Sequence, residues 1–162
     1  MMTRPLLQVS PDEEASASWV GVPPIAVQQL WFTLQRHPWT SLAVIPADDE
    51  TSGPAFARPL HDVGRLVLGD RLRLLDVRTL KLEDTAAMIL EMTGSQSTAE
   101  RPRFLLQLDS VLSRPSGVPV ALAADCAVLC VELGKTRLAG ARKTLEILGK
   151  SRFLGCITLP PR

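Results

Sequence analysis

The chain has 162 residues, a length that fits one domain of ordinary size. Hydrophobic residues make up 46% of it, which allows a buried core and excludes a chain that is disordered throughout. The net charge of +1 does not favour a broad electrostatic surface for nucleic acid or an anionic membrane. No apolar run approaches the roughly 20 residues that span a bilayer, and no signal peptide is evident, so we expect a cytoplasmic protein.

The amino-terminal segment differs in composition from the rest of the chain. It carries an acidic run at residues 12–14 among alanine and serine, together with four prolines: Pro5, Pro11, Pro23 and Pro24. This composition is typical of a segment that cannot bury enough apolar surface to fold. We therefore expect residues 1–24 to form a flexible, proline-rich tail and residues 25–162 to form the domain.

The domain opens with a predicted helix at Ile25–Arg36, which reads as apolar on most sides. Pro38 ends it, because the residue before a proline avoids the helical region. Within this helix Trp31 and Phe32 are adjacent. Two roles are open for the pair: a contact for a protein partner, or packing in the core of the domain itself.

Five short apolar runs predict β-strands: Leu42–Ile45, Leu72–Asp76, Phe104–Asp109, Ala127–Val131 and Leu154–Leu159. Three helices are predicted between them: Ala55–Gly64, interrupted at Pro59 and ended by its glycine, then Thr79–Met92 and Arg137–Leu148. The strands are continuously apolar, as is typical of strands buried on both faces. We predict an α/β fold: a doubly wound, mainly parallel five-stranded sheet with helices on both faces.

The loop after the first strand, Pro46–Pro54, stands where a nucleotide-binding protein would carry G-x-x-x-x-G-K-[ST]. It has one glycine, no lysine and three consecutive acidic residues, Asp48 to Glu50. Its prolines remove backbone donors, and a like-charge contact with a phosphate costs about 1–4 kcal/mol. We therefore expect that this loop does not bind nucleotide, and we predict no cofactor.

Two of the predicted strands end in an aspartate. Asp76 and Asp109 stand at carboxyl ends of strands, where ATPases hold magnesium, but an aspartate there also caps the next turn. Without a phosphate loop, we favour the capping role. The cysteines lie in apolar segments and are expected to be buried and reduced, and we assign no metal site.

Once these elements are placed, the carboxyl-terminal stretch "DCAVLCVELGKTRLAGARKTLEILGKSRFLGCITLPPR" resembles the end of the ATPase domain of bacterial tyrosine kinases of capsule and exopolysaccharide export. These kinases belong to the MinD/ParA-like branch of the P-loop ATPases. The matching features are an aspartate before an apolar strand, a Gly-Lys-Thr turn, a basic helix and a last apolar strand: Asp125, Gly134–Thr136, Arg137–Leu148 and Leu154–Leu159. Upstream, "RFLLQLDSV" is similar to the Walker B strand, with Asp109 at its aspartate, and "RLRLLDVRT" places Asp76 at another acidic position.

The chain also departs from this family. The Walker A lysine is missing, and Arg78 stands where a second aspartate is usual. The family's ring contact, Glu-x-x-Arg-x-x-Arg, is replaced by Ile25, Gln28 and Trp31. The chain contains no tyrosine, which excludes autophosphorylation on tyrosine. The resemblance therefore implies a degenerate P-loop ATPase domain whose Walker A motif is lost.

We predict a non-catalytic pseudo-ATPase, not an enzyme, that acts as an adaptor or regulatory subunit in bacterial exopolysaccharide or cellulose synthesis or secretion. The resemblance implies a protein partner such as a membrane-bound polysaccharide synthase or export subunit, reached through Trp31 and Phe32, in a homodimer or hetero-oligomer. Such a partner would hold the protein at the inner membrane; nucleic acid is not expected. Three alternatives are open: a working ATPase with an atypical loop, a scaffold of an unrelated bacterial assembly, and a different enzyme on the same sheet. For the different enzyme, Ser52 and Ser110 are candidate nucleophiles, but no histidine stands in a recognisable relation to them as a base.

Overall fold

The computed structural model describes residues 24–94 and 101–160. Apart from Pro24, the predicted tail lies outside the described residues. The helices are α1 (Ile25–Leu34), α2 (Pro54–Leu68), α3 (Thr85–Thr93), α4 (Val118–Ala123) and α5 (Leu138–Leu148). The strands are β1 (Ser41–Pro46), β2 (Leu72–Asp76), β3 (Arg103–Gln107), β4 (Cys126–Glu132) and β5 (Phe153–Leu159). Short 3-10 turns are η2 (Gly69–Arg71), η3 (Leu82–Asp84), η4 (Pro115–Gly117) and η5 (Lys150–Arg152).

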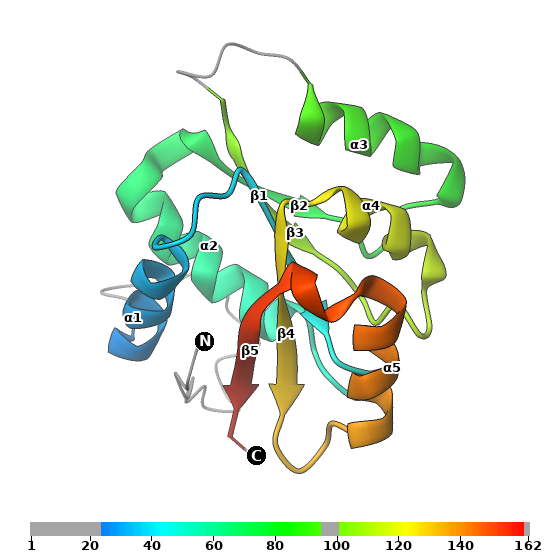
Figure 1. Cartoon of the computed structure of the whole chain (residues 1–162). Coiled ribbons are helices and arrows are strands. Elements are labelled where there is room, and N and C mark those ends of the chain that lie inside the picture. The colour runs from blue at the N-terminus through cyan, green and yellow to red at the C-terminus, as the bar shows by residue number, and fades with distance from the viewer. Residues whose placement is uncertain (1–23, 95–100, 161–162) are drawn as a thin grey trace.

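The strands form one sheet in the order β2-β3-β1-β4-β5, and every pairing is parallel. Helices α1 and α2 cover one face of the sheet, and α3, α4 and α5 cover the other (Figure 1). The predicted α/β class and five-stranded sheet are confirmed, and the sheet is parallel throughout. Its carboxyl edge, where ligands of such sheets bind, carries the loop between β1 and α2.

Each face of the sheet has its own hydrophobic core. The core under α1 and α2 includes Trp31, Phe56 and Val128, and the core under α3 and α4 includes Met92 and Phe104. All six residues of β1 are buried, since this central strand has a strand on each side and helices over both faces. The two cores thus pack against both faces of the sheet whose carboxyl edge carries the loops.

Helix α1 is more regular than the sequence analysis indicated. Its buried side chains recur with helical spacing: Val27, Leu30, Trp31 and Leu34. Ile25 and Phe32 point to solvent, with 72% and 56% of their surface exposed. The helix thus carries apolar residues on more than one side, as predicted, but only the stripe completed by Val27 is buried.

Helix α2 continues past both residues that were expected to limit it. Pro59 lies inside the helix and is buried, and the helix ends only at Gly69, whose φ of 59° suits glycine. Gly64 is needed for packing: a Cβ there would lie 2.6 Å from the Trp31 ring and 2.3 Å from Leu72 Cδ2. The predicted stop at Gly64 is therefore wrong, because this glycine lets α1 approach α2.

Helix α3 begins six residues later than predicted. Asp76 Oδ1 accepts a hydrogen bond from the Arg78 amide at 3.1 Å, which makes a turn directly after β2. The chain then passes through the 3-10 turn η3, where Thr85 Oγ1 donates to the Leu82 carbonyl at 2.7 Å. This turn chemistry holds Thr79–Lys81 out of the helix.

Candidate functional site at the carboxyl edge of the sheet

The loop between β1 and α2 is closed by one of its own carboxylates. Asp48 is buried, with 4% of its surface exposed. Its Oδ2 accepts a hydrogen bond of 2.6 Å from the amide of Arg137, the residue that begins α5. Its Oδ1 accepts hydrogen bonds from the Glu50 amide at 3.1 Å and from Thr51 Oγ1 at 2.9 Å. The first acidic residue of the loop therefore binds protein donors on both sides.

Two threonines extend this network to the strand end of β4 and to α5. The hydroxyls of Thr51 and Thr136 are 2.6 Å apart, and Thr136 Oγ1 accepts a hydrogen bond from the Glu132 amide at 2.8 Å. Thr144 Oγ1 donates to the Ala47 carbonyl at 2.8 Å from the buried side of α5. The loop is therefore fastened to the β4–α5 connection at several points.

Two glycines allow the close packing of this loop. A Cβ on Gly53 would lie 2.5 Å from the carbonyl oxygen of Leu108, and a Cβ on Gly140 would lie 2.6 Å from Asp48 Cβ. Contacts under 3.0 Å require a shift of the neighbouring atoms. The single glycine of the loop thus allows the chain to approach the residue that follows β3.

The lysine of the Gly-Lys-Thr turn also forms an ion pair within the chain. Lys135 Nζ lies 3.1 Å from Glu132 Oε1, and Glu132 is almost fully buried, with 1% of its side chain exposed. Arg137 reaches Glu50 at 3.6 Å on the surface of the loop. The cations near the loop thus lie within ion-pair distance of carboxylates of the chain itself.

A second group of charges lies at the ends of β2 and β3. Arg78 donates to both oxygens of Asp76, at 2.9 and 2.7 Å, and Asp109 pairs with Arg114 at 3.2 Å. The amide of Gln107, turned so that its oxygen faces Arg78, accepts from Arg78 Nε at 2.8 Å. The hydrogen bonds from Arg78 lower the pKa of Asp76, so the carboxylate stays ionised.

The two aspartates differ in their roles. The expected turn-capping role is confirmed for Asp76, whose carboxylate accepts the Arg78 amide. Asp109 lies two residues beyond β3, and the described contact of its carboxylate is the ion pair with Arg114. In the described residues, no three His, Cys, Asp or Glu side chains gather in a way that could hold a metal ion.

The cysteines are free thiols, as predicted. Cys126 and Cys130 are buried in the core under α1 and α2, and Cys156 on β5 is half-buried. Burial raises the pKa of Cys126 to about 12 and also raises the pKa of Cys130 and Cys156. These thiols therefore stay protonated near neutral pH and are weak nucleophiles.

The two predicted partner contacts are placed differently. Trp31 is fully buried, and its ring lies edge-on to Trp39 with centroids 6.0 Å apart. The interpretation of Trp31 as a partner contact was wrong, because its side chain fills the core, the second role that the sequence left open. Phe32 is 56% exposed, and its contact with a partner stays a prediction.

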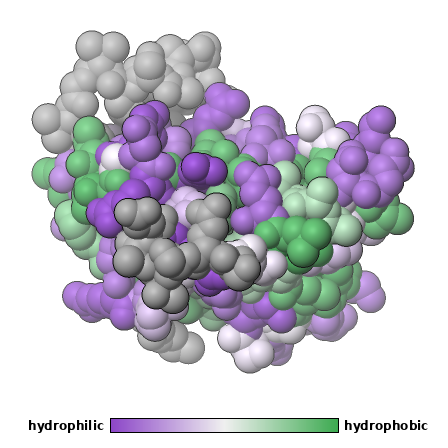
Figure 2. Space-filling model, turned by 90° about the horizontal axis from the view of Figure 1, so that it is seen from above, coloured by the Kyte–Doolittle hydropathy of each residue, from purple (hydrophilic) through white to green (hydrophobic). Residues whose placement is uncertain are grey.

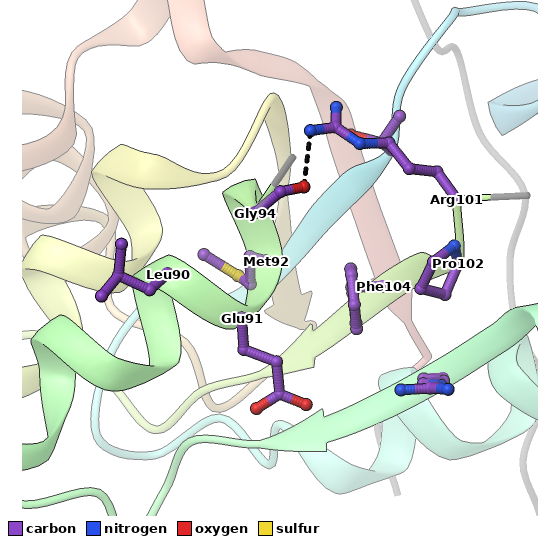
Figure 3. Close-up of a pocket in the computed structure, with 9 residues that line it drawn as sticks. Leu90, Glu91, Met92, Gly94, Arg101, Pro102 and Phe104 are labelled. Carbon is purple, nitrogen blue, oxygen red and sulfur yellow. Dashed lines mark hydrogen bonds between the residues drawn. The ribbon is translucent and has the colours of Figure 1, made fainter. Parts of the chain in front are cut away.

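The opposite, amino edge of the sheet is hollowed between the end of α3 and the start of β3. The hollow has a volume of about 380 Å³, and Leu90, Met92 and Phe104 are among its lining residues (Figure 3). Arg101 Nη2 donates to the Gly94 carbonyl at 2.7 Å, so this guanidinium ties the two elements together. Seen from this edge, hydrophilic residues lie across much of the face, with smaller groups of hydrophobic residues between them (Figure 2).

Asp125 fastens the starts of β1 and β4 at the same edge. Its Oδ2 accepts hydrogen bonds from the Thr40 amide at 2.6 Å, from Thr40 Oγ1 at 2.7 Å and from the Ser41 amide at 3.2 Å. Partial burial opposes ionisation, but these hydrogen bonds outweigh it and lower the pKa of Asp125. The aspartate that contributes to the resemblance thus has a structural role in this sheet.

Asp125→Asn is expected to reduce stability more at neutral pH than in acid. A carboxyl whose pKa is lower in the folded state stabilises the fold above its unfolded pKa of about 3.9, and this contribution is lost as the pH falls through the folded pKa. The difference in free energy of unfolding between wild type and variant, measured by urea denaturation, should therefore shrink from pH 6 toward about pH 2. A difference independent of pH would contradict the role given to the carboxylate.

The chain matches no protein-family model, and a search of the curated proteins finds no match. No helix in the described parts of the chain is long and apolar enough to cross a membrane. Sequence reasoning found the altered loop but missed how Asp48, Thr136 and Thr144 hold it. The residues next to Asp48 in the sequence do not indicate that it is buried, because its hydrogen-bond partner Arg137 lies 89 residues away in the chain.

Proposed function

We propose that the protein is a non-catalytic pseudo-ATPase that acts through its surface as an adaptor or regulatory subunit. The observation that carries this proposal is the burial of Asp48 in the loop after β1, with its carboxylate bonded to the Arg137 amide. The position that would receive phosphates in an ATPase is used here to join the loop to α5.

A nucleotide would have to displace this network. Removing Asp48 from its donors leaves buried groups without partners, which costs about 1–3 kcal/mol for each group. A triphosphate would also approach Asp49 and Glu50, which are exposed on the same loop. Both effects oppose binding, and the loop has no lysine that would offset them.

The neighbouring strand ends support the same proposal. Strand β3, whose sequence is similar to a Walker B strand, lies beside β1, as a metal site shared with the loop would require. However, Asp109 is paired with Arg114, and Asp76 is paired with Arg78. Arginines thus neutralise the carboxylates that a magnesium ion would need.

The biological setting of the proposal rests on the resemblance alone. We propose a cytoplasmic protein that is held at the inner membrane by a polysaccharide synthase or export subunit. Phe32 is the proposed contact, together with Ile25 seven positions earlier on the same exposed face of α1. Exposed aromatic side chains often dominate the energy of protein contacts.

Nucleotide is expected to leave the melting temperature unchanged. Only a ligand that binds the folded state stabilises it, and a ligand at 100 times its Kd adds about 2.7 kcal/mol. For a domain of this size that stabilisation would raise the Tm by roughly 5–11 °C. The measurement is a thermal melt with ATP or ADP and magnesium at millimolar concentration.

An Asp109→Asn variant serves as the control in the same melt. A shift of several degrees in the wild type that is lost in Asp109→Asn would overturn the proposal and support a working ATPase with an atypical loop. A shift that is equal in both proteins would show nucleotide binding without the Walker B aspartate, and would also contradict a loop that excludes nucleotide.

A further inference from the structure

The outer edge of β5 is unpaired within the described residues. β5 pairs with β4 on one side, and no other described strand pairs with its second side (Figure 1). The seven residues of β5, FLGCITL, contain no charge and no proline, whereas β2 at the opposite edge carries Arg73 and Asp76. Charged side chains on an edge strand oppose pairing with another strand. The edge of β5 is therefore the one that can accept a further strand.

Helix α1 brings the preceding part of the chain toward the carboxyl end of this edge. The last turn of α1 lies at the amino edge of the sheet, where Arg103, the first residue of β3, donates a hydrogen bond to Gln35. The ten residues of α1 span about 15 Å, which places Ile25 toward the carboxyl edge (Figure 1). Helix α1 also shares its core with Ile157 and Leu159 of β5. The chain therefore enters α1 on the side of the sheet where β5 ends.

The hand of the crossovers decides which edge a strand before α1 can join. From β1 to β2 the chain moves toward the β2 edge, with α2 on one face of the sheet. The three later crossovers move the opposite way and have α3, α4 and α5 on the opposite face, so all four share one hand (Figure 1). A strand at the β5 edge that is followed by α1 and β1 has this same hand, because α1 lies on the face of α2. A strand at the β2 edge would have the opposite hand.

The residues directly before α1 suit a short edge strand. Ser18–Val22 lies outside the described residues; its sequence, SWVGV, is uncharged and contains three residues that are favoured in strands. Pro23 and Pro24 end this run, and two residues are an ordinary connection between a strand and a helix. We propose that Ser18–Val22 forms a sixth strand of the sheet, parallel to β5 and paired along Leu154–Thr158. The proposal does not depend on the proposed function.

Two features of this register favour the chain's own segment as the occupant of the edge. Trp19 lies beside Gly155, and an aromatic side chain next to a strand glycine covers the backbone that the glycine leaves bare. Glu14, the last residue of the acidic run, lies level with Lys150, since each stands four residues before its paired segment. Residues 142–152, at the end of α5 and in the turn before β5, carry four cations and one carboxylate. The acidic run therefore meets a basic surface.

The backbone of β5 determines the hydrogen bonds of the proposed pair. The Leu159 carbonyl accepts a hydrogen bond from the Leu133 amide at 2.9 Å, so the backbone groups of Leu159 point toward β4. Because successive residues of a strand point their backbone groups to opposite sides, those of Cys156 point to the open edge. In the proposed register the Cys156 amide donates to the Trp19 carbonyl, and the Cys156 carbonyl accepts from the Gly21 amide.

Hydrogen exchange of the full chain, followed residue by residue by NMR, tests this pairing. The Cys156 amide should be protected in the wild type. Gly21→Pro removes the amide that donates to Cys156 and should make the Cys156 amide exchange roughly tenfold faster or more, whereas Gly21→Ala keeps that amide and should not. Circular dichroism establishes that both variants keep the fold of the domain. Wild-type exchange at the rate of an unfolded chain, or no effect of Gly21→Pro, would overturn the proposal.

An engineered disulfide tests the register and the occupant independently. Paired strands lie about 4.8 Å apart, so Val20→Cys places a thiol within disulfide reach of Cys156. Mild oxidation should link the two within one chain, as mass spectrometry can show, and should fail with Val9→Cys, because Val9 precedes the proposed strand. Cys126 and Cys130 are buried and do not compete. A link that joins two chains would show a second copy at this edge and would overturn the proposal, as would equal linking of Val9→Cys.

Discussion

Trp31→Ala is expected to lower the free energy of unfolding by about 3–5 kcal/mol, the usual cost of removing a large buried aromatic side chain. The Trp31 ring is fully buried, contacts Trp39, and lies where a Cβ on Gly64 would clash. Its removal leaves a cavity between α1 and α2 that these helices cannot easily close. Urea denaturation followed by circular dichroism measures the change.

Phe32→Ala is the matched control on the next residue of the same helix. Because 56% of its surface is exposed, the change in free energy of unfolding should stay within about 0.5 kcal/mol. Equal losses from both variants would contradict the packing described for α1. A stable Phe32→Ala variant also makes the partner contact testable, since a weakened complex could not be attributed to unfolding.

The strands were predictable from sequence because burial on both faces leaves a continuous apolar signal. The runs at Leu42–Ile45 and Ala127–Val131 are the centres of β1 and β4, which occupy the interior of the sheet. Helix limits were less predictable. Gly64 has the local appearance of a stop, but a tertiary contact with Trp31 requires it inside α2.

The candidate site was predictable only in part. The absence of a lysine and the acidic run showed that the loop at Pro46–Pro54 is not an ordinary phosphate loop. That Asp48 would be buried while Asp49 and Glu50 are exposed depends on the position of α5, which no local pattern encodes. Similarly, the ion pair between Asp109 and Arg114 follows from the turn after β3.

Asp48→Ala is expected to destabilise the fold by about 1–3 kcal/mol or more, because it leaves the Arg137 amide without its acceptor. The Glu50 amide and the Thr51 hydroxyl lose the same carboxylate. Since a domain is stabilised by only about 5–15 kcal/mol in total, this is a large effect for a loop residue. Urea denaturation of the variant against wild type measures it.

Asp49→Ala is the control for this loop, because it removes the same charge from an exposed neighbour and should change the free energy of unfolding by less than about 0.5 kcal/mol. Asp48→Ala should also remain unresponsive to ATP and magnesium in a thermal melt, because relieving one negative charge supplies neither the lysine nor the glycines that hold phosphates. If Asp48→Ala is as stable as Asp49→Ala, the buried carboxylate does not hold the loop, and the main support for a pseudo-ATPase is lost. If it is destabilised and still ignores nucleotide, the carboxylate serves the fold, and the surface of the protein is the place to seek its function.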